Sequence, residues 1–230
     1  MATDNPQTEW QTLNADDGHT FDAYVARPAG KPTGVVLVIQ EIFGVNSHIQ
    51  SVCERFAESG YLAVAPALFD RQERNYQVGY EEKDMARSRE LMQNLNFDNA
   101  CHDMAAVITE FGKHGAVSAV GFCLGGSLAY LLATRDERLA GSVCYYGRLI
   151  PDFAEESPKC PTLLHFGETD HTIPLDSVDE VREMQPELPI YLYPAGHGFN
   201  CDQRGAYHEE SAKLAWKRTL AFLEKVSNGG

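Results

Sequence analysis

The chain has 230 residues and a formal net charge of −14 at pH 7, from 19 basic and 33 acidic side chains. This acidity argues against nucleic acid and anionic membrane surfaces as partners, because both repel a negatively charged protein. No apolar run is long enough to cross a bilayer, and residues 1–6 lack the basic and apolar regions of a signal peptide. We therefore expect a cytoplasmic protein that folds as one domain over residues 1–230.

The first part of the chain predicts an antiparallel entry followed by alternating strands and helices. Residues 10–13 and 19–25 are strand-like and flank a turn at 14–18. Residues 34–40 form a continuous aliphatic run, which is typical of an interior strand of a parallel sheet. The next expected elements are a helix from Ser47 to Gly60, a strand over 61–66, a long polar loop over 67–79, and helices over 81–93 and 97–111.

The second part of the chain continues this alternation. Its expected strands are 117–121, 139–146, 161–167 and 190–193, and its expected helices are 127–134, 177–184 and 207–226. Together the two parts predict an α/β fold, with a mostly parallel, doubly wound sheet, helices on both faces and right-handed crossovers. Ligands of such sheets bind at the carboxyl ends of the strands.

One stretch between a strand and a helix has the spacing of a nucleophile elbow. Gly121, Cys123 and Gly125 stand in the Gly-x-nucleophile-x-Gly pattern, with a thiol where serine is usual. Glycines suit this turn because the strand and the helix approach closely on either side of the nucleophile. The alternative is a buried structural cysteine in a glycine-rich turn.

Three further ionisable residues follow predicted strands and decide between these interpretations. Glu41 follows the strand over 34–40, Asp170 follows the one over 161–167, and His197 follows the one over 190–193. The order nucleophile, acid, histidine is that of the α/β-hydrolases. A histidine can take the thiol proton, and a carboxylate can hold that histidine in one tautomer.

Each of these residues also has a plainer interpretation. Asp170 in a glycine-rich turn could form the turn, His197 could lie in a surface loop, and Glu41 could be a solvated carboxylate. His165 and His171 are rivals to His197, although His165 stands inside a strand and His171 is adjacent to Asp170. An oxyanion hole is expected from the backbone N–H groups of Leu124 and Ile42.

Several short segments resemble the dienelactone hydrolase (carboxymethylenebutenolidase) family, from about Phe21 to the terminal helix. They are Gln40-Glu41-Ile42-Phe43-Gly44-Val45-Asn46, Gly121-Phe122-Cys123-Leu124-Gly125-Gly126, Tyr145-Tyr146-Gly147, Asp170-His171 with Pro174, and Gly196-His197-Gly198-Phe199.

The resemblance implies a single α/β-hydrolase domain without a lid and a catalytic triad of Cys123, His197 and Asp170. It also implies that Glu41 lies beside the thiol and keeps it neutral until a substrate binds, which would protect the thiol from oxidation. Tyr145 matches an active-site tyrosine of the family. The implied activity is hydrolysis of small activated esters or lactones through an acyl-enzyme, with no cofactor and no metal.

The family's substrate arginines match only in part. Arg71 stands where one of them is expected, but Cys201 stands four residues after His197, where the family has the other. Arg204, three residues further on, is the candidate substitute. This departure leaves the acyl-transfer residues intact and weakens the case for dienelactone itself as the physiological substrate.

The expected partner is a small-molecule ester or lactone, anionic if the arginines bind its carboxylate, and the protein is expected as a monomer or small homo-oligomer. The six cysteines and eight histidines form no Cys-x-x-Cys pair and no zinc-ligand spacing. Two other hypotheses stay open. One is a binding protein that retains the hydrolase scaffold, and the other is a thiol redox sensor in which Cys144 or Cys201 pairs with Cys123.

Overall fold

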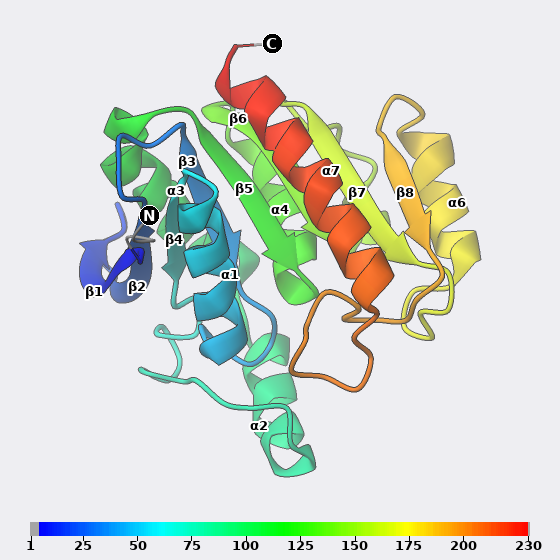
Figure 1. Ribbon diagram of the computed structural model, residues 1–230. Helices are drawn as coiled ribbons and strands as arrows, with labels where there is room; N and C mark the ends of the chain where they lie inside the picture. The colour runs from blue at the N-terminus through cyan, green and yellow to red at the C-terminus, as the bar shows by residue number, and fades with distance from the viewer. Residues whose placement is uncertain (1–4, 230) are drawn as a thin grey trace. The chain divides into compact units, whose positions relative to one another are not determined.

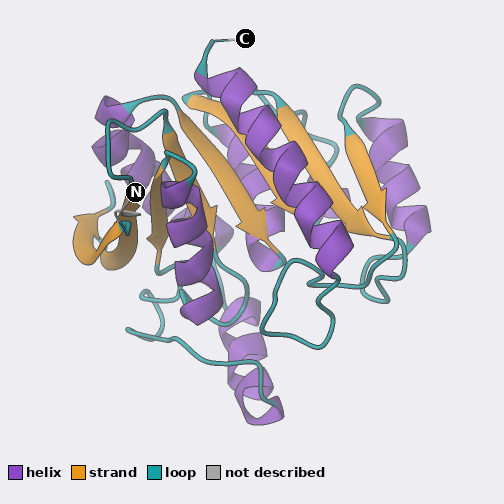
Figure 2. Ribbon diagram, in the orientation of Figure 1, coloured by secondary structure: helices purple, strands orange, loops and turns teal. Residues whose placement is uncertain are grey.

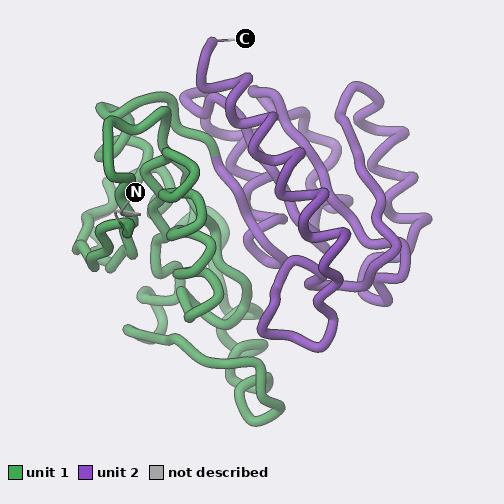
Figure 3. The backbone as a smooth tube through the Cα atoms, viewed as in Figure 1, with its two compact units in different colours: residues 1–118 green, residues 119–230 purple. Residues whose placement is uncertain are grey.

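The computed structural model describes residues 5–229, and the chain divides into two compact units, residues 1–118 and 119–230 (Figure 3). The boundary between them falls inside strand β5 (Val117–Phe122). Among the described residues no helix combines the length and the apolar character that a membrane span requires. Each unit is an α/β structure of its own, with strands and helices that alternate along the chain (Figure 2).

The first unit has four strands in the order β1-β2-β4-β3, and β2 pairs antiparallel with both of its neighbours. β3 and β4 pair in parallel, and every residue of these two strands is buried, as the aliphatic run over 34–40 predicts. The elements of this unit are β1 (Gln7–Asn14), β2 (Thr20–Arg27), β3 (Val35–Ile39), α1 (Ser47–Glu58), β4 (Leu62–Pro66), α2 (Glu82–Gln93), α3 (Phe97–Phe111) and a 3₁₀ turn (Gly112–His114).

The second unit continues with the order β5-β6-β7-β8, in which β6, β7 and β8 pair in parallel. Its other elements are α4 (Leu124–Arg135), β6 (Leu139–Tyr145), α5 (Ile150–Phe153), β7 (Thr162–Gly167), α6 (Leu175–Met184), β8 (Ile190–Tyr193) and α7 (Glu209–Ser227). α7 crosses the front of these strands and α4 lies behind them (Figure 1). Residues 124–134 of α4 are all buried, so this helix belongs to the core of the unit.

These elements confirm the predicted α/β class with mostly parallel strands. Several helix boundaries differ from the expectation, and α4 begins at Leu124 rather than at residue 127. α6 begins at Leu175, directly after Pro174, because the fixed backbone of proline suits the residue before a first turn. α7 begins at Glu209, where the side chain of His208 accepts a hydrogen bond from the Ser211 N–H and caps the helix. The short helix α5 was not expected. A single domain over residues 1–230 stays a prediction.

Candidate active site

Cys123 lies in a strained turn between β5 and α4. Its φ of 55° and ψ of −114° are unusual for a residue with a side chain. A Cβ on Gly121 would stand 1.8 Å from the carbonyl oxygen of Gly125, so only glycine allows the strand and the helix to approach this closely. The Cys123 N–H donates to the carbonyl oxygen of Tyr145 at 3.0 Å, which ties the turn to the end of β6. This is the geometry of a nucleophile elbow.

The structure brings three of the predicted residues together within the second unit. The Cys123 Sγ lies 3.1 Å from Nε2 of His197, and Nδ1 of the same ring lies 2.7 Å from Oδ2 of Asp170. Asp170 follows β7 and His197 follows β8, so both reach the site from the carboxyl ends of parallel strands. The Asp170 side chain is fully buried, the His197 side chain is 18% exposed, and Cys123 is half-buried. A thiol, an imidazole and a carboxylate in this chain of hydrogen bonds can move a proton from sulfur to nitrogen.

Thr172 also belongs to this group, although it was not among the residues predicted from the sequence. Its backbone N–H and its hydroxyl donate to Oδ1 of Asp170 at 2.8 and 2.7 Å. The same hydroxyl oxygen lies 3.1 Å from Nδ1 of His197. An aspartate followed two residues later by a threonine is a turn pattern, and this pattern could have indicated the contact with Asp170. Thr172 therefore holds the carboxylate in the orientation that meets the imidazole.

The charges of the site favour a protonated imidazole. Burial alone lowers the pKa of His197, but the charge of a Cys123 thiolate and the hydrogen bonds with Asp170 and Cys123 outweigh it and raise the pKa to about 10. Burial alone raises the pKa of Asp170, whereas the hydrogen bonds from His197 and Thr172 hold it below its ordinary value. The arrangement therefore stabilises the imidazolium that forms when the proton of the Cys123 thiol moves to His197.

The two expected oxyanion donors lie in different units. Leu124 is the first residue of α4, so its N–H has no acceptor within the helix and lies at the positive end of the helix dipole. Ile42 lies in the turn between β3 and α1 of the first unit and is buried. A shared oxyanion hole stays a prediction.

Tyr145 and Tyr146 have different surroundings, although they are adjacent in the chain. Tyr145 is fully buried, and its hydroxyl forms a hydrogen bond of 2.7 Å with Oγ1 of Thr219 on α7. The ring of Tyr146 lies 5.1 Å from the ring of His197, centroid to centroid. The role of Tyr145 as an active-site tyrosine stays a prediction, and the structure places the ring of Tyr146 next to the histidine.

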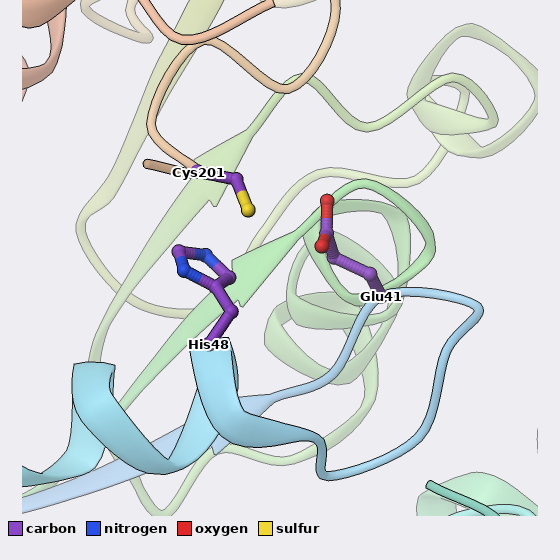
Figure 4. A group of neighbouring side chains, drawn as sticks. All are labelled: Glu41, His48 and Cys201. Carbon is purple, nitrogen blue, oxygen red and sulfur yellow. The ribbon is translucent and has the colours of Figure 1, made fainter. Parts of the chain in front are cut away.

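Glu41 is fully buried in the first unit, directly after β3. Its Oε2 accepts a hydrogen bond of 2.7 Å from the Tyr80 hydroxyl, a partner that the sequence reasoning did not identify. A carboxylate oxygen of Glu41 and an imidazole nitrogen of His48 lie within 4.8 Å of each other (Figure 4). His48 projects from the first turn of α1. The predicted role of Glu41 beside the thiol stays a prediction.

The two candidate substrate arginines lie in different units of the chain. Arg71 in the first unit donates through Nε and Nη2 to Asp103 at 2.9 and 2.7 Å, and its Nη1 lies 2.7 Å from a carboxylate oxygen of Asp17. Arg204 in the second unit is half-buried, and its guanidinium lies over Gly198 in the loop that carries the histidine. A Cβ on Gly198 would stand 2.6 Å from Nη1 of Arg204.

The chain is similar to known proteins along most of its length. A model of the dienelactone hydrolase family matches residues 21–227. The carboxymethylenebutenolidase of Pseudomonas putida is 34% identical over 235 residues, which cover 96% of this chain and 98% of that protein. A Yersinia pestis protein named as a candidate carboxymethylenebutenolidase is 34% identical over 93% of this chain and 86% of its own. The crystal structure of a candidate dienelactone hydrolase from Klebsiella pneumoniae is 32% identical, with a TM-score of 0.82 over 94% of this chain and 98% of that one.

Proposed function

The chain belongs to the dienelactone hydrolase family, and from that premise we propose that it cleaves small activated esters or lactones with Cys123 as nucleophile. Membership makes it a hydrolase of ester or lactone bonds. The observation that carries the proposal is the chain of contacts from Sγ of Cys123 through His197 to Asp170, at 3.1 and 2.7 Å.

The first half of the reaction transfers the acyl group to sulfur. His197 takes the thiol proton, and Sγ of Cys123 attacks the carbonyl carbon while the electron pair of the C=O bond moves to oxygen. The Leu124 N–H at the start of α4 stabilises this oxyanion. The pair then returns, the C–O bond to the leaving group breaks, and the departing oxygen takes the proton from His197. Asp170 stabilises the imidazolium throughout and is not itself protonated.

The second half releases the acid. A water molecule attacks the thioester carbon while His197 takes one of its protons, and the C–S bond breaks as the acid forms. The proton on His197 then returns to the sulfur. A thiolate is a good leaving group and a weak base, so the first half succeeds only when the substrate oxygen also leaves easily. We therefore propose enol-lactones and aryl esters as substrates, rather than alkyl esters or amides.

The binding of an anionic substrate falls to Arg71 or Arg204. Arg71 already meets two carboxylates, those of Asp103 and Asp17, and this pairing lowers its capacity for a third. Arg204 lies in the loop that carries His197, in the same unit as the thiol and the imidazole, and on that placement we propose it as the substrate arginine. We expect Arg204→Gln to raise KM for an anionic lactone more than for its neutral methyl ester. If Arg71→Gln alone shows that selectivity, the assignment to Arg204 is wrong.

The proposal is tested by turnover of p-nitrophenyl acetate and of an enol-lactone by the wild type, Cys123→Ala and Cys160→Ala. Cys160 is also a half-buried free thiol of the second unit, so its variant controls for the loss of a cysteine as such. We expect Cys123→Ala to lose activity and Cys160→Ala to keep it. Undiminished turnover by Cys123→Ala would contradict the proposal.

The two alternatives have their own signatures in the same preparations. Tight ligand binding without turnover across a broad ester panel would favour a binding protein. A disulfide between Cys123 and Cys144 or Cys201 after oxidant titration would favour a redox sensor, although both of these partners are fully buried. The cytoplasmic location and the oligomeric state stay predictions.

A further inference from the structure

The second unit contains a buried polar cluster of side chains that have no part in the proposed reaction. Its members are Tyr145, His165, Tyr193, Arg218 and Thr219. His165 on β7 is fully buried, with Nδ1 2.8 Å from the Tyr193 hydroxyl and Nε2 3.2 Å from Oγ1 of Thr219. The hydroxyl of Thr219, which is also fully buried, forms a second hydrogen bond of 2.7 Å with the Tyr145 hydroxyl. Nη1 of Arg218 donates to the Tyr193 hydroxyl at 3.0 Å. Thr219 therefore joins helix α7 to strand β7 through His165 and to strand β6 through Tyr145.

The direction of these hydrogen bonds follows from what each group can donate. Burial lowers the pKa of His165 to about 3, so its ring is neutral and has one donor and one acceptor. Arg218 can only donate, so the Tyr193 oxygen accepts from it and the Tyr193 proton goes to Nδ1 of His165. Nε2 then carries the hydrogen and donates to Thr219. The Thr219 oxygen thus accepts from His165, and its second hydrogen bond joins it to the Tyr145 hydroxyl.

The backbone of the same residues binds the Cys123 amide and the amide of Tyr146, the tyrosine next to His197. The carbonyl oxygen of Tyr145 accepts the Cys123 N–H at 3.0 Å, and the carbonyl oxygen of His165 accepts the Tyr146 N–H at 2.8 Å. Tyr146 has a φ of 39°, and its ring lies against His197. Because a tyrosine rarely adopts this φ, surrounding contacts must hold it there.

The end of β6 is also closely packed against α4. A Cβ on Gly126 would stand 2.3 Å from the carbonyl oxygen of Tyr145, and one on Gly147 would stand 2.6 Å from the Ser127 nitrogen. The Tyr145 ring stacks on Phe122, the last residue of β5, with the ring centroids 4.7 Å apart. Because there is no free space around Tyr145, a shift of this residue also displaces the turn that carries Cys123.

We propose that Thr219 is a positioning residue of the thiol–imidazole pair. Its hydroxyl forms hydrogen bonds with His165 and Tyr145 and thereby holds the end of β6 in place. The Cys123 amide is bonded to that strand end, and the Tyr146 ring follows it, so its position sets the distance from Sγ of Cys123 to Nε2 of His197. Thr219 has no contact with the reacting atoms and acts through Tyr145 and His165. The inference deepens the proposed function and rests on it, because it concerns the same cysteine and histidine.

A matched pair of variants tests this proposal. Thr219→Val keeps the shape and removes the hydroxyl, whereas Thr219→Ser keeps the hydroxyl and removes a methyl group. We expect Thr219→Val to lower kcat for p-nitrophenyl acetate by about three- to tenfold with KM unchanged, because one to two hydrogen bonds are lost. Thr219→Ser should recover most of that loss. Tyr145→Phe removes the other hydroxyl of the pair and should reproduce the effect of Thr219→Val.

A second readout does not depend on ester turnover. The rate at which iodoacetamide alkylates Cys123, followed by mass mapping of its peptide, reports how well His197 activates the thiol. We expect Thr219→Val and Tyr145→Phe to change this rate and Thr219→Ser to retain the wild-type rate. A lower melting temperature with wild-type kcat per folded molecule and wild-type alkylation would mean that Thr219 is only structural, and would overturn the proposal.

The two readouts also separate this inference from the proposed function. If Cys123→Ala still hydrolyses the ester, the proposed function fails, and the alkylation rates alone decide the role of Thr219. If turnover depends on Cys123 but neither readout responds to Thr219→Val, the proposed function stands and the positioning role is wrong.

Discussion

Two histidines of the second unit, His197 and His165, show how neighbours decide what an imidazole can do. His197 lies between a thiol and a carboxylate, and these raise its pKa to about 10. His165 lies between two hydroxyls, and burial together with the nearby charge of Arg218 lowers its pKa to about 3. One ring is therefore prepared to hold a proton, and the other is kept neutral.

The two rings have different tasks, and they are linked to two adjacent tyrosines at the end of β6. Tyr146 lies against His197, whereas Tyr145 shares Thr219 with His165. A ring that gains a proton during the reaction needs a partner that stabilises its charged form, and the Asp170 carboxylate does this for His197. A ring that fixes geometry needs partners that never change charge, and hydroxyl groups meet that requirement at neutral pH.

The strongest way to test this contrast is to make the same substitution at both positions. His197→Gln should lower kcat for p-nitrophenyl acetate by about 10³-fold or more, because the thiol loses its base. His165→Gln should lower kcat by about tenfold or less, because it disturbs only the hydrogen-bond cluster. Steady-state kinetics at temperatures below each melting transition measure both effects. Equal losses of kcat in the two variants would contradict the different roles proposed for His197 and His165.

A smaller loss is expected when the carboxylate next to His197 becomes an amide. Asp170→Asn should lower kcat by about 10²- to 10³-fold, since an amide no longer holds the imidazole with its proton on Nδ1. Asp176→Asn, on the exposed side of α6, is the matched control and should leave kcat unchanged. Wild-type turnover by Asp170→Asn would show that the contact of 2.7 Å with His197 has no catalytic role.

The next effect in size concerns the hydroxyl of Thr172, which contacts both the carboxylate and the ring. Thr172→Val should lower kcat by about three- to tenfold, because one hydrogen bond to Asp170 is lost. Thr172→Ser keeps the hydroxyl and should stay within about twofold of the wild type. Comparable losses in both variants would assign the effect to the methyl group and its packing.

The smallest effect is a difference in how stability depends on pH. Because the folded-state pKa of His197 is raised from 6.5 to about 10, its contribution is fully present below pH 6.5 and is lost as the pH rises through 10. His165 has the opposite sign, since its pKa is lowered from 6.5 to about 3. Its contribution is present above pH 6.5 and is lost as the pH falls toward 3.

Urea unfolding from pH 5 to pH 10 measures these contributions as the difference between wild type and each glutamine variant. The difference for His197→Gln should shrink toward alkaline pH, and the difference for His165→Gln should shrink toward acidic pH. The same slope for both variants would contradict the opposite pKa shifts.

Much of the site's placement could be predicted from the sequence because it depends on local patterns. Cys123, Asp170 and His197 each follow a strand of a parallel sheet, and the carboxyl ends of such strands meet at one edge. Glycines on both sides of Cys123 indicated the sharp turn, and the structure has the close approach of Gly121 to Gly125 that requires them. The contacts among these side chains are observed, while their catalytic roles stay predictions.

The rest of the site depends on contacts between distant parts of the chain. Thr219 meets His165 and Tyr145 across 54 and 74 residues, and only the path of α7 over the strands decides that contact. The contact of the Tyr146 ring with His197 depends on the unusual φ of Tyr146 after the end of β6, which no sequence pattern indicated.

The ion pairs of Arg71 could not be predicted from the sequence either, because their partners are distant in the chain. The carboxylates that meet its guanidinium belong to Asp103 on α3 and to Asp17 in the turn after β1. A polar loop with an arginine after a parallel strand is typical of a binding residue. Ion pairs with distant carboxylates give a competing structural explanation that only the fold reveals.

The most direct test of the central claim is to trap the acyl group. The protein is mixed with p-nitrophenyl acetate, quenched in acid at successive times, and digested for mass spectrometry. We predict that the peptide containing Cys123 gains one acetyl group during the burst of p-nitrophenol and loses it at the rate of turnover. Turnover without an acetyl group on this peptide, or with the group on another residue, would contradict the account.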